Sequence, residues 1–95
     1  MVHSGALVAI PTPGKYMARL CNHFAHRLTV HRKETQARID FPNAPCSLQA
    51  LADSLDIRID APDRTTLVRL QEVVTRHLKQ VASAECFEVT WRDLE

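Results

Sequence analysis

The chain has 95 residues, of which 45% are hydrophobic and 24% are charged, and this composition is typical of a globular protein and excludes a disordered one. Twelve Lys and Arg residues nearly balance eleven Asp and Glu residues, so the formal net charge is only +1 and the basic field that attracts nucleic acids and anionic membranes is missing. We therefore expect a single α+β domain over residues 1–95 that has no nucleic-acid partner and no membrane partner.

The first part of the chain predicts a short strand followed by an amphipathic helix. The run GALVAI at residues 5–10 is compatible with a strand, and Thr12 and Pro13 are a capping residue and a proline suited to the first helical position. From Pro13 to about Arg27, apolar residues recur at the spacing of one buried helical stripe. This stripe consists of Met17, Leu20, Cys21, Phe24 and Leu28.

Residues 28–60 change to the period-two pattern that is typical of strands. Four segments separated by turn-forming residues predict a meander of four strands. The alternation is clearest where Leu55, Ile57 and Ile59 point to one side and charged residues point to the other. The four segments are LTVHRK (28–33), QARIDF (36–41), CSLQALA (46–52) and SLDIRID (54–60).

A second helix and a last strand are expected in the remainder of the chain. Pro62 near the first helical position and Asp63 in the first turn both favour a helix start. The helix should continue to about Ala84, and the alternating run CFEVTW at residues 86–91 predicts a final strand. The apolar stripe of the helix consists of Leu67, Leu70, Val74, Leu78 and Val81.

These elements follow the order β-α-β-β-β-β-α-β, which predicts a two-layer α+β sandwich. Two helices with one apolar stripe each can cover one face of a mainly antiparallel sheet. The other face must meet water or another chain. Its residues carry both signs of charge, so we expect either a solvated face or a homodimer formed through the sheet, and another protein partner is the alternative. The polar residues expected on this face are Arg38, Asp40, Gln49, Asp56, Arg58 and Asp60.

The segment LCNHFAHR, residues 20–27, places a cysteine and two histidines close together and raises the question of a metal site. On a helix, Cys21 lies roughly 160° from His23 and points into the apolar stripe, so these two side chains cannot share a metal ion. His23 and His26 lie about 60° apart and can meet on one outer flank. Two imidazoles are too few for a zinc site, and His77 is expected on a separate element. We therefore expect no metal ion at these histidines.

No catalytic constellation can be recognised in the sequence. Cys21 and Cys46 are expected to be buried and unreactive. No Ser-His-Asp arrangement or isolated carboxylate pair stands out, and Gly5 and Gly14 are the two glycines of the chain, so there is no phosphate-binding loop. His77 is expected at a helix edge with one ring nitrogen hydrogen-bonded.

The cysteine count and the N-terminal segment indicate a cellular location. Three cysteines without a Cys-x-x-Cys pair do not form a disulfide framework, so reduced thiols are expected. The apolar run near Met1 is too short for a signal peptide or a membrane-spanning helix. Together these features predict a cytoplasmic protein.

Five segments together resemble a bacterial family. The segments are YMARLCNHFAHR, ARIDF, CSLQA, APDRTTLVRLQEVVTRHL and FEVTW, and they span nearly the whole chain. As a set they resemble the small bacterial proteins of domain-of-unknown-function family 2218. The resemblance implies no established activity, and it implies a link to iron and siderophore utilisation.

Two hypotheses of function follow from the sequence. The favoured one is a non-enzymatic binding or interaction module, accessory to iron or siderophore utilisation, with no cofactor. The alternative is a small enzyme or carrier that holds iron, haem or zinc through His23 and His26, with Cys46 or His77 nearby. Metal content and an absorption spectrum of the purified protein distinguish the two hypotheses.

Overall fold

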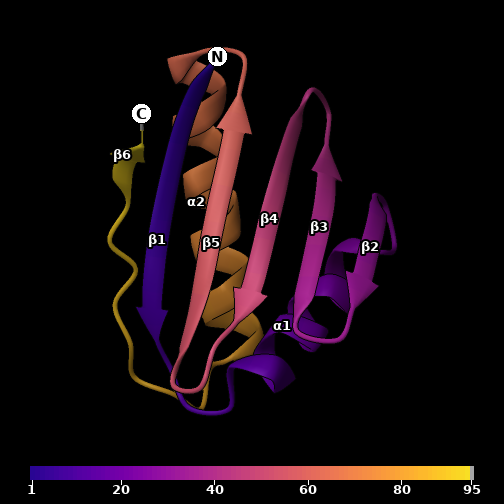
Figure 1. The fold of residues 1–95 in the computed structure, drawn as a ribbon, viewed down its shortest axis with the longest axis vertical. Coiled ribbons are helices and arrows are strands. Elements are labelled where there is room, and N and C mark those ends of the chain that lie inside the picture. The colour runs from indigo at the N-terminus through magenta and orange to yellow at the C-terminus, as the bar shows by residue number, and fades with distance from the viewer. Residues whose placement is uncertain (95) are drawn as a thin grey trace.

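The structure is a computed structural model that describes residues 1–94, and it has the element order expected from the sequence. Six strands form one antiparallel sheet and both helices lie behind it, so the two-layer α+β fold is confirmed (Figure 1). The elements are β1 (Val2–Ala9), α1 (Pro13–Phe24), β2 (Thr29–Lys33), β3 (Gln36–Phe41), β4 (Ala44–Ala50), β5 (Ser54–Ala61), α2 (Arg64–Val81) and β6 (Arg92–Leu94).

The strand order across the sheet is β2-β3-β4-β5-β1-β6. Strands β2 to β5 form the expected meander, in which each strand pairs with the next one in the chain. The N-terminal strand β1 then pairs with β5 on one side and with β6 on the other. Segments from the two ends of the chain therefore lie side by side at one edge of the sheet.

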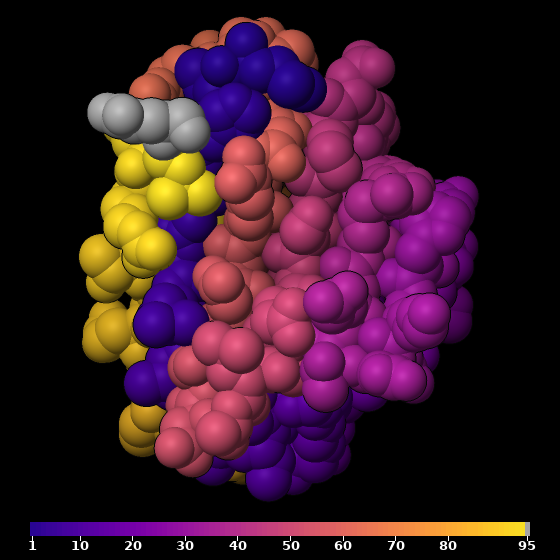
Figure 2. Space-filling view, viewed as in Figure 1, coloured from indigo at the N-terminus to yellow at the C-terminus, as the bar shows by residue number. Residues whose placement is uncertain are grey.

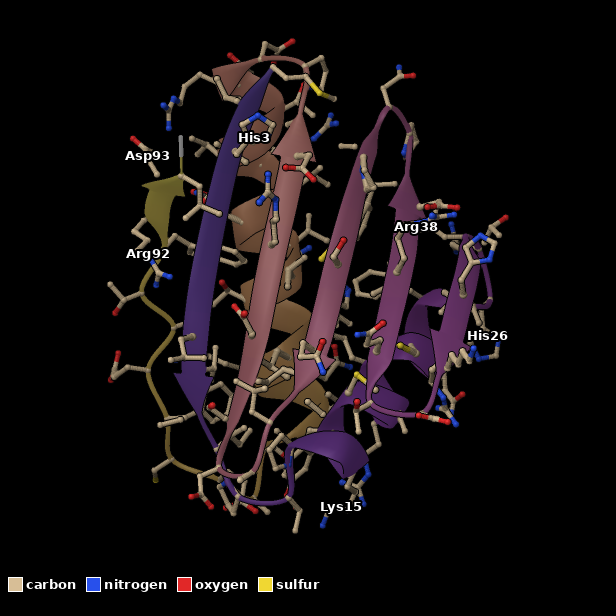
Figure 3. The ribbon with its side chains drawn as sticks, viewed as in Figure 1. His3, Lys15, His26, Arg38, Arg92 and Asp93 are labelled. Atoms are coloured by element: carbon tan, nitrogen blue, oxygen red, sulfur yellow. The ribbon has the colours of Figure 1, made fainter. Side chains whose placement is uncertain are left out.

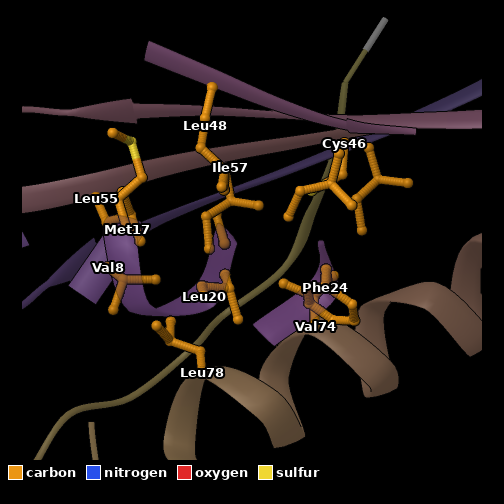
Figure 4. Packing of buried hydrophobic residues seen from close by; sticks show 14 of the residues in the cluster. Val8, Met17, Leu20, Phe24, Cys46, Leu48, Leu55, Ile57, Val74 and Leu78 are labelled. Carbon is orange, nitrogen blue, oxygen red and sulfur yellow. The ribbon is translucent and has the colours of Figure 1, made fainter. Parts of the chain in front are cut away.

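The core lies between the sheet and the two helices. Leu55, Ile57 and Ile59 of β5 are fully buried, as their alternation predicts. From the helices, Leu20 and Val74 are also fully buried and point toward the sheet (Figure 4). Because β3, β4 and β5 bury alternate residues, the remaining side chains of these strands face away from the helices. We call this second surface the open face.

The two helix starts differ in how their backbone N–H groups are capped. Thr12 adopts a left-handed conformation with φ 46° and makes no side-chain capping hydrogen bond, so the expectation that it caps α1 is wrong. Asp63 is the N-cap of α2 and accepts a hydrogen bond from the Thr66 N–H at 2.8 Å. This places Pro62 before the cap instead of inside the helix.

The final strand is shifted from its expected position. Residues 86–91 form no strand, and β6 covers only Arg92–Leu94. Phe87, Val89 and Trp91 do share one side, but they pack as partly buried residues against the core. The Trp91 Nε1–H donates to the Thr75 hydroxyl of α2 at 2.9 Å. This segment is thus held by the helix layer, and its alternation reflects that packing instead of strand pairing.

Among the residues described, neither helix has the length and the apolar character that crossing a membrane requires.

Candidate functional site: a cleft lined by three histidines

Two histidines from different helices meet at one end of the helix layer. The rings of His23, near the end of α1, and His77, in α2, have their centroids 4.6 Å apart and are tilted by 42°. They line an open cleft of about 410 Å³, which we call the histidine cleft. Its lining residues are His23, Phe24, His26, Arg27, Leu28 and His77.

The end of α1 shapes this cleft. The sequence pattern predicts a helix to about Arg27, but α1 ends at Phe24. The Phe24 carbonyl then accepts hydrogen bonds from the N–H groups of both Arg27 and Leu28, at 3.1 and 2.9 Å. The chain therefore turns directly after the helix. His26 consequently lies in this turn between α1 and β2, where Figure 3 labels it, and not on the helical flank that it was expected to share with His23.

Phe24 forms the apolar wall of the cleft and joins it to the core. Its side chain is 8% exposed and makes edge contacts with the rings of Phe41 and His23, at centroid distances of 5.1 and 5.3 Å. The His77 ring lies 5.0 Å away. The two imidazoles are thus positioned by one aromatic ring that is itself fixed between the layers.

His77 has a defined tautomer. Its Nδ1 lies 2.6 Å from the backbone carbonyl oxygen of Val73, which can only accept a hydrogen bond, so Nδ1 carries the proton and donates it. When the ring is neutral, the other nitrogen, Nε2, has a lone pair. The expected helix-edge position with one nitrogen hydrogen-bonded is confirmed. A neutral imidazole held in this way can accept a hydrogen bond or coordinate a metal ion.

The cysteines do not belong to this site. Cys21 is 2% exposed and Cys46 is fully buried, so both are core residues as expected. Burial raises the pKa of the Cys21 thiol and raises that of the Cys46 thiol to about 12. Cys46 does not line the histidine cleft. In residues 1–94, no group of three or more His, Cys, Asp or Glu side chains is placed to hold a metal ion.

The open face carries two further histidines, each beside an aspartate. His3 donates from Nδ1 to Asp60 at 2.5 Å, and His31 donates from Nε2 to Asp40 at 3.1 Å. Within residues 1–94, neither histidine is hydrogen-bonded to a serine or cysteine side chain, so these pairs do not extend into a catalytic triad. Ser4 faces the helices instead, where it accepts a hydrogen bond from Gln71.

The sequence did not reveal that His23 and His77 are in contact. They are far apart in the chain, and each pattern shows only that its own histidine lies beside an apolar stripe. Their contact depends on how α1 and α2 pack against each other under the sheet. The sequence does contain one indication of the site. Phe24 is the last apolar residue of the α1 stripe and is adjacent to His23, which places this histidine beside the edge of the core.

The fold and the cleft define a small α+β domain with an open cleft at one end of its helix layer. The chain belongs to the bacterial domain-of-unknown-function family 2218, described as "Uncharacterized protein conserved in bacteria", whose model matches residues 5–92. The chain is also similar to a solved structure, the NMR structure of PA4090 from Pseudomonas aeruginosa. The two are 32% identical with a TM-score of 0.81, and the match covers 97% of this chain and 96% of that chain. None of the curated proteins matches. The family resemblance of the sequence is confirmed.

Proposed function

We propose that this protein is a non-enzymatic binding module that takes its ligand at the histidine cleft. The observation that carries the proposal is the convergence of His23 and His77, from two helices, beside the aromatic wall of Phe24. A concave, partly apolar surface with a few polar groups is the usual form of a small-molecule site. Arg27 adds a cation to the lining. The ligand that fits best is a flat, partly apolar molecule with an anionic group.

Within this class we propose a ligand from iron handling, either an iron-loaded siderophore or haem. Haem and ferric catecholate siderophores each combine flat rings with anionic oxygen atoms, and this matches a cleft that offers Phe24, Leu28 and a cationic side chain. The role is accessory, since the ligand is held and not transformed. We also propose a cytoplasmic location, because Cys21, Cys46 and Cys86 are all free thiols.

A second candidate is a carrier of a bare metal ion, and the fixed tautomer of His77 favours it. The hydrogen bond from Nδ1 to Val73 leaves Nε2 free, which is the arrangement that metal-binding histidines require. His23 and His26 line the same cleft and would supply the other imidazoles for zinc or iron. This candidate needs side chains to rotate, because no three ligand groups now converge in the described residues.

One set of titrations tests both candidates. Haemin, a ferric catecholate complex and zinc sulfate are added separately to the protein and followed by absorption spectra and by ¹H–¹⁵N NMR. The binding-module proposal expects haemin or the catecholate to shift the resonances of the cleft, with at least tenfold weaker binding in His23→Gln and His77→Gln. His31→Gln, a histidine change on the open face, is the matched control and should bind normally.

The outcomes separate the two candidates. Zinc alone bound at about one equivalent, and lost in His23→Ala, would replace the proposal with the metal carrier. If none of the three probes shifts a cleft resonance, both candidates are wrong.

We further propose that the chain forms a homodimer through its sheet. Asp40 and Asp60 are already paired within the chain by Arg38 and Arg58, so the charged open face has little left to offer a second copy. The free edge of β2 is the better contact, because its outer backbone groups pair with no other strand of the described sheet. Sedimentation at micromolar protein should give twice the monomer mass of 10.7 kDa. Monomer mass at both low and high salt would remove the dimer.

A further inference from the structure

The strand register places basic residues in one line across the open face. Residues directly opposite each other in neighbouring antiparallel strands point to the same side of a sheet. Figure 2 shows this face, built by segments from both ends of the chain. Following the pairings from β2 to β6 gives one continuous row. It consists of His31, Arg38, Ser47, Arg58, Gly5 and Arg92.

Two arginines of this row are held in the same way. The tripeptide Arg-Ile-Asp occurs in both β3 and β5, at residues 38–40 and 58–60. The Arg38 Nε–H donates to Asp40 at 2.8 Å, and the Arg58 Nε–H donates to Asp60 at 2.9 Å. Both strands run in the same direction, since β4 lies antiparallel between them. The two guanidinium groups are therefore anchored through Nε in matching orientations.

Anchoring through Nε leaves the Nη groups of Arg38 and one Nη group of Arg58 without a partner in the described residues, while Nη2 of Arg58 lies 3.5 Å from Nδ1 of His3. Within the described residues, Asp40 and Asp60 are the carboxylates that pair with Arg38 and Arg58, respectively, and no second carboxylate pairs with either arginine. A guanidinium group whose outer N–H donors are free is suited to carboxylate and phosphate oxygens, which it can bind in a bidentate way. The side chains of Arg38 and Arg58 are about half exposed, at 52% and 49%, and are accessible to a ligand.

Between the two arginines the surface is low and polar. Ser47 of β4 is paired with both of them, so its short side chain separates the two guanidinium groups. With strands about 4.8 Å apart, the Cα atoms of Arg38 and Arg58 are roughly 10 Å apart. The long side chains of both arginines can reach the same ligand across this distance. The hydroxyl of Ser47 can donate a further hydrogen bond from the floor.

An open basin of about 490 Å³ covers this part of the face. Three of its lining residues, Lys33, Arg38 and Arg58, carry a permanent positive charge on the open face, and His31 lies beside them. Arg32 also lines the basin, but it is paired with the buried Ala37, so its side chain points to the helix side of the sheet. Asp56 is the single carboxylate among the lining residues.

Asp40 and Asp60 partly neutralise Arg38 and Arg58, so the basin has no large net charge. Its attraction for an anion comes from Lys33 and from the free N–H donors of the two guanidinium groups.

We infer that this basin, over β2 to β5, binds a small organic anion through the guanidinium groups of Arg38 and Arg58, with the Ser47 hydroxyl beneath it. The recognised group is an oxyanion, either a carboxylate or a phosphate. The site lies on the surface opposite the helix layer and is separate from the histidine cleft. The inference therefore does not depend on the function proposed for that cleft.

The test is an NMR titration of the intact protein in low salt with two probes, citrate and inorganic phosphate. We expect shifts confined to the backbone amides and arginine side chains around Arg38, Ser47 and Arg58. Arg38→Gln and Arg58→Gln should each weaken binding about tenfold. Arg38→Lys keeps the charge but removes the forked donors, and it should also weaken binding. Arg76→Gln, an equal charge change on an exposed position of α2, should leave it unchanged.

The results separate specific binding from general charge attraction. A preference for citrate or for phosphate identifies the oxyanion and supports the site in either case. Equal weakening by Arg38→Gln and Arg76→Gln, or full retention in Arg38→Lys, would reduce it to non-specific attraction and overturn the inference. If a probe at about 10 mM shifts no resonance around the basin, the inference is wrong. It is also wrong if the protein forms a dimer that buries the open face. Normal dispersion of the spectra of the variants shows that they are folded, so that weaker binding is not caused by unfolding.

Discussion

Replacement of Phe24 by leucine tests whether one aromatic ring supports both the core and the histidine cleft. The side chain is 8% exposed and contacts three rings, those of Phe41, His23 and His77. Leucine keeps an apolar side chain at this position but removes every ring contact.

The expected loss can be worked from these contacts. An aromatic pair contributes about 0.5–1.5 kcal/mol beyond its buried area, and the two imidazole pairs lie near solvent, so they belong at the lower end. Non-additivity among neighbouring contacts limits the sum. We expect the free energy of unfolding to fall by about 1–3 kcal/mol, as measured by urea denaturation. The ring proton resonances of His23 and His77 should both shift, because the ring that faces them is gone.

Phe41→Leu is the matched control. Phe41 is also 8% exposed, but its ring contacts Phe24 and neither histidine. This variant should lose stability while the resonances of His23 and His77 stay close to their wild-type positions. If Phe24→Leu unfolds within about 0.5 kcal/mol of wild type and leaves both imidazole spectra unmoved, the ring does not organise the cleft.

Three further predictions concern other parts of the molecule. In the native protein, a thiol reagent at pH 8 should modify the exposed Cys86 quickly and Cys46 only on unfolding, as followed by mass spectrometry. Cys46 is buried, and its pKa of about 12 leaves it roughly a thousandfold less thiolate than the ordinary pKa of 9.0 would. Rapid labelling of Cys46 would contradict its placement in the core. Burial alone raises the pKa of Asp60, but the hydrogen bonds from His3 and Arg58 outweigh burial and hold this pKa below 3.8. The folded state therefore binds fewer protons than the unfolded state, so stability is lost as the pH falls below 3.8. Asp60→Asn should therefore be less stable than wild type at pH 7. Its free energy of unfolding, measured by urea denaturation, should also fall less steeply at acidic pH than that of wild type. An unchanged slope at acidic pH would show that Asp60 is not responsible. Thr12→Asn should raise the melting temperature and stabilise the protein by about 0.5–1 kcal/mol. Asparagine tolerates the left-handed backbone of residue 12 better than a β-branched residue does. A loss of stability would mean that Thr12 makes a contact that outweighs its backbone strain.

Most of the fold could be predicted from the sequence because the two helices and the strands β3 and β5 carry clear helical or period-two patterns. The alternation of Leu55, Ile57 and Ile59 survives intact as the buried side of β5. The same rule failed at residues 86–91, since an extended segment that packs on a helix also buries every second residue. Alternation reports a buried side, and it does not report which neighbour buries it.

The candidate site was less accessible to sequence reasoning. The sequence correctly separated Cys21 from His23, because both lie on one helix and their angle follows from the helical repeat. It could not place His77 against His23, because that contact depends on the packing of two helices. The end of α1 at Phe24 was also missed, since neither glycine nor proline marks the turn that carries His26.

The position of β1 between β5 and β6 affects the order in which the protein can fold. The hairpins from β2 to β5 join neighbouring segments, so they can close as soon as those residues have left the ribosome. The strand β1 is synthesised first but must wait for β5, and its other side stays open until residues 92–94 arrive. A nascent chain therefore exposes both edges of β1 until β5 has emerged, and the outer edge of β1 until residues 92–94 follow. The outer edge of β1 is therefore closed by a segment that is made about 90 residues after it.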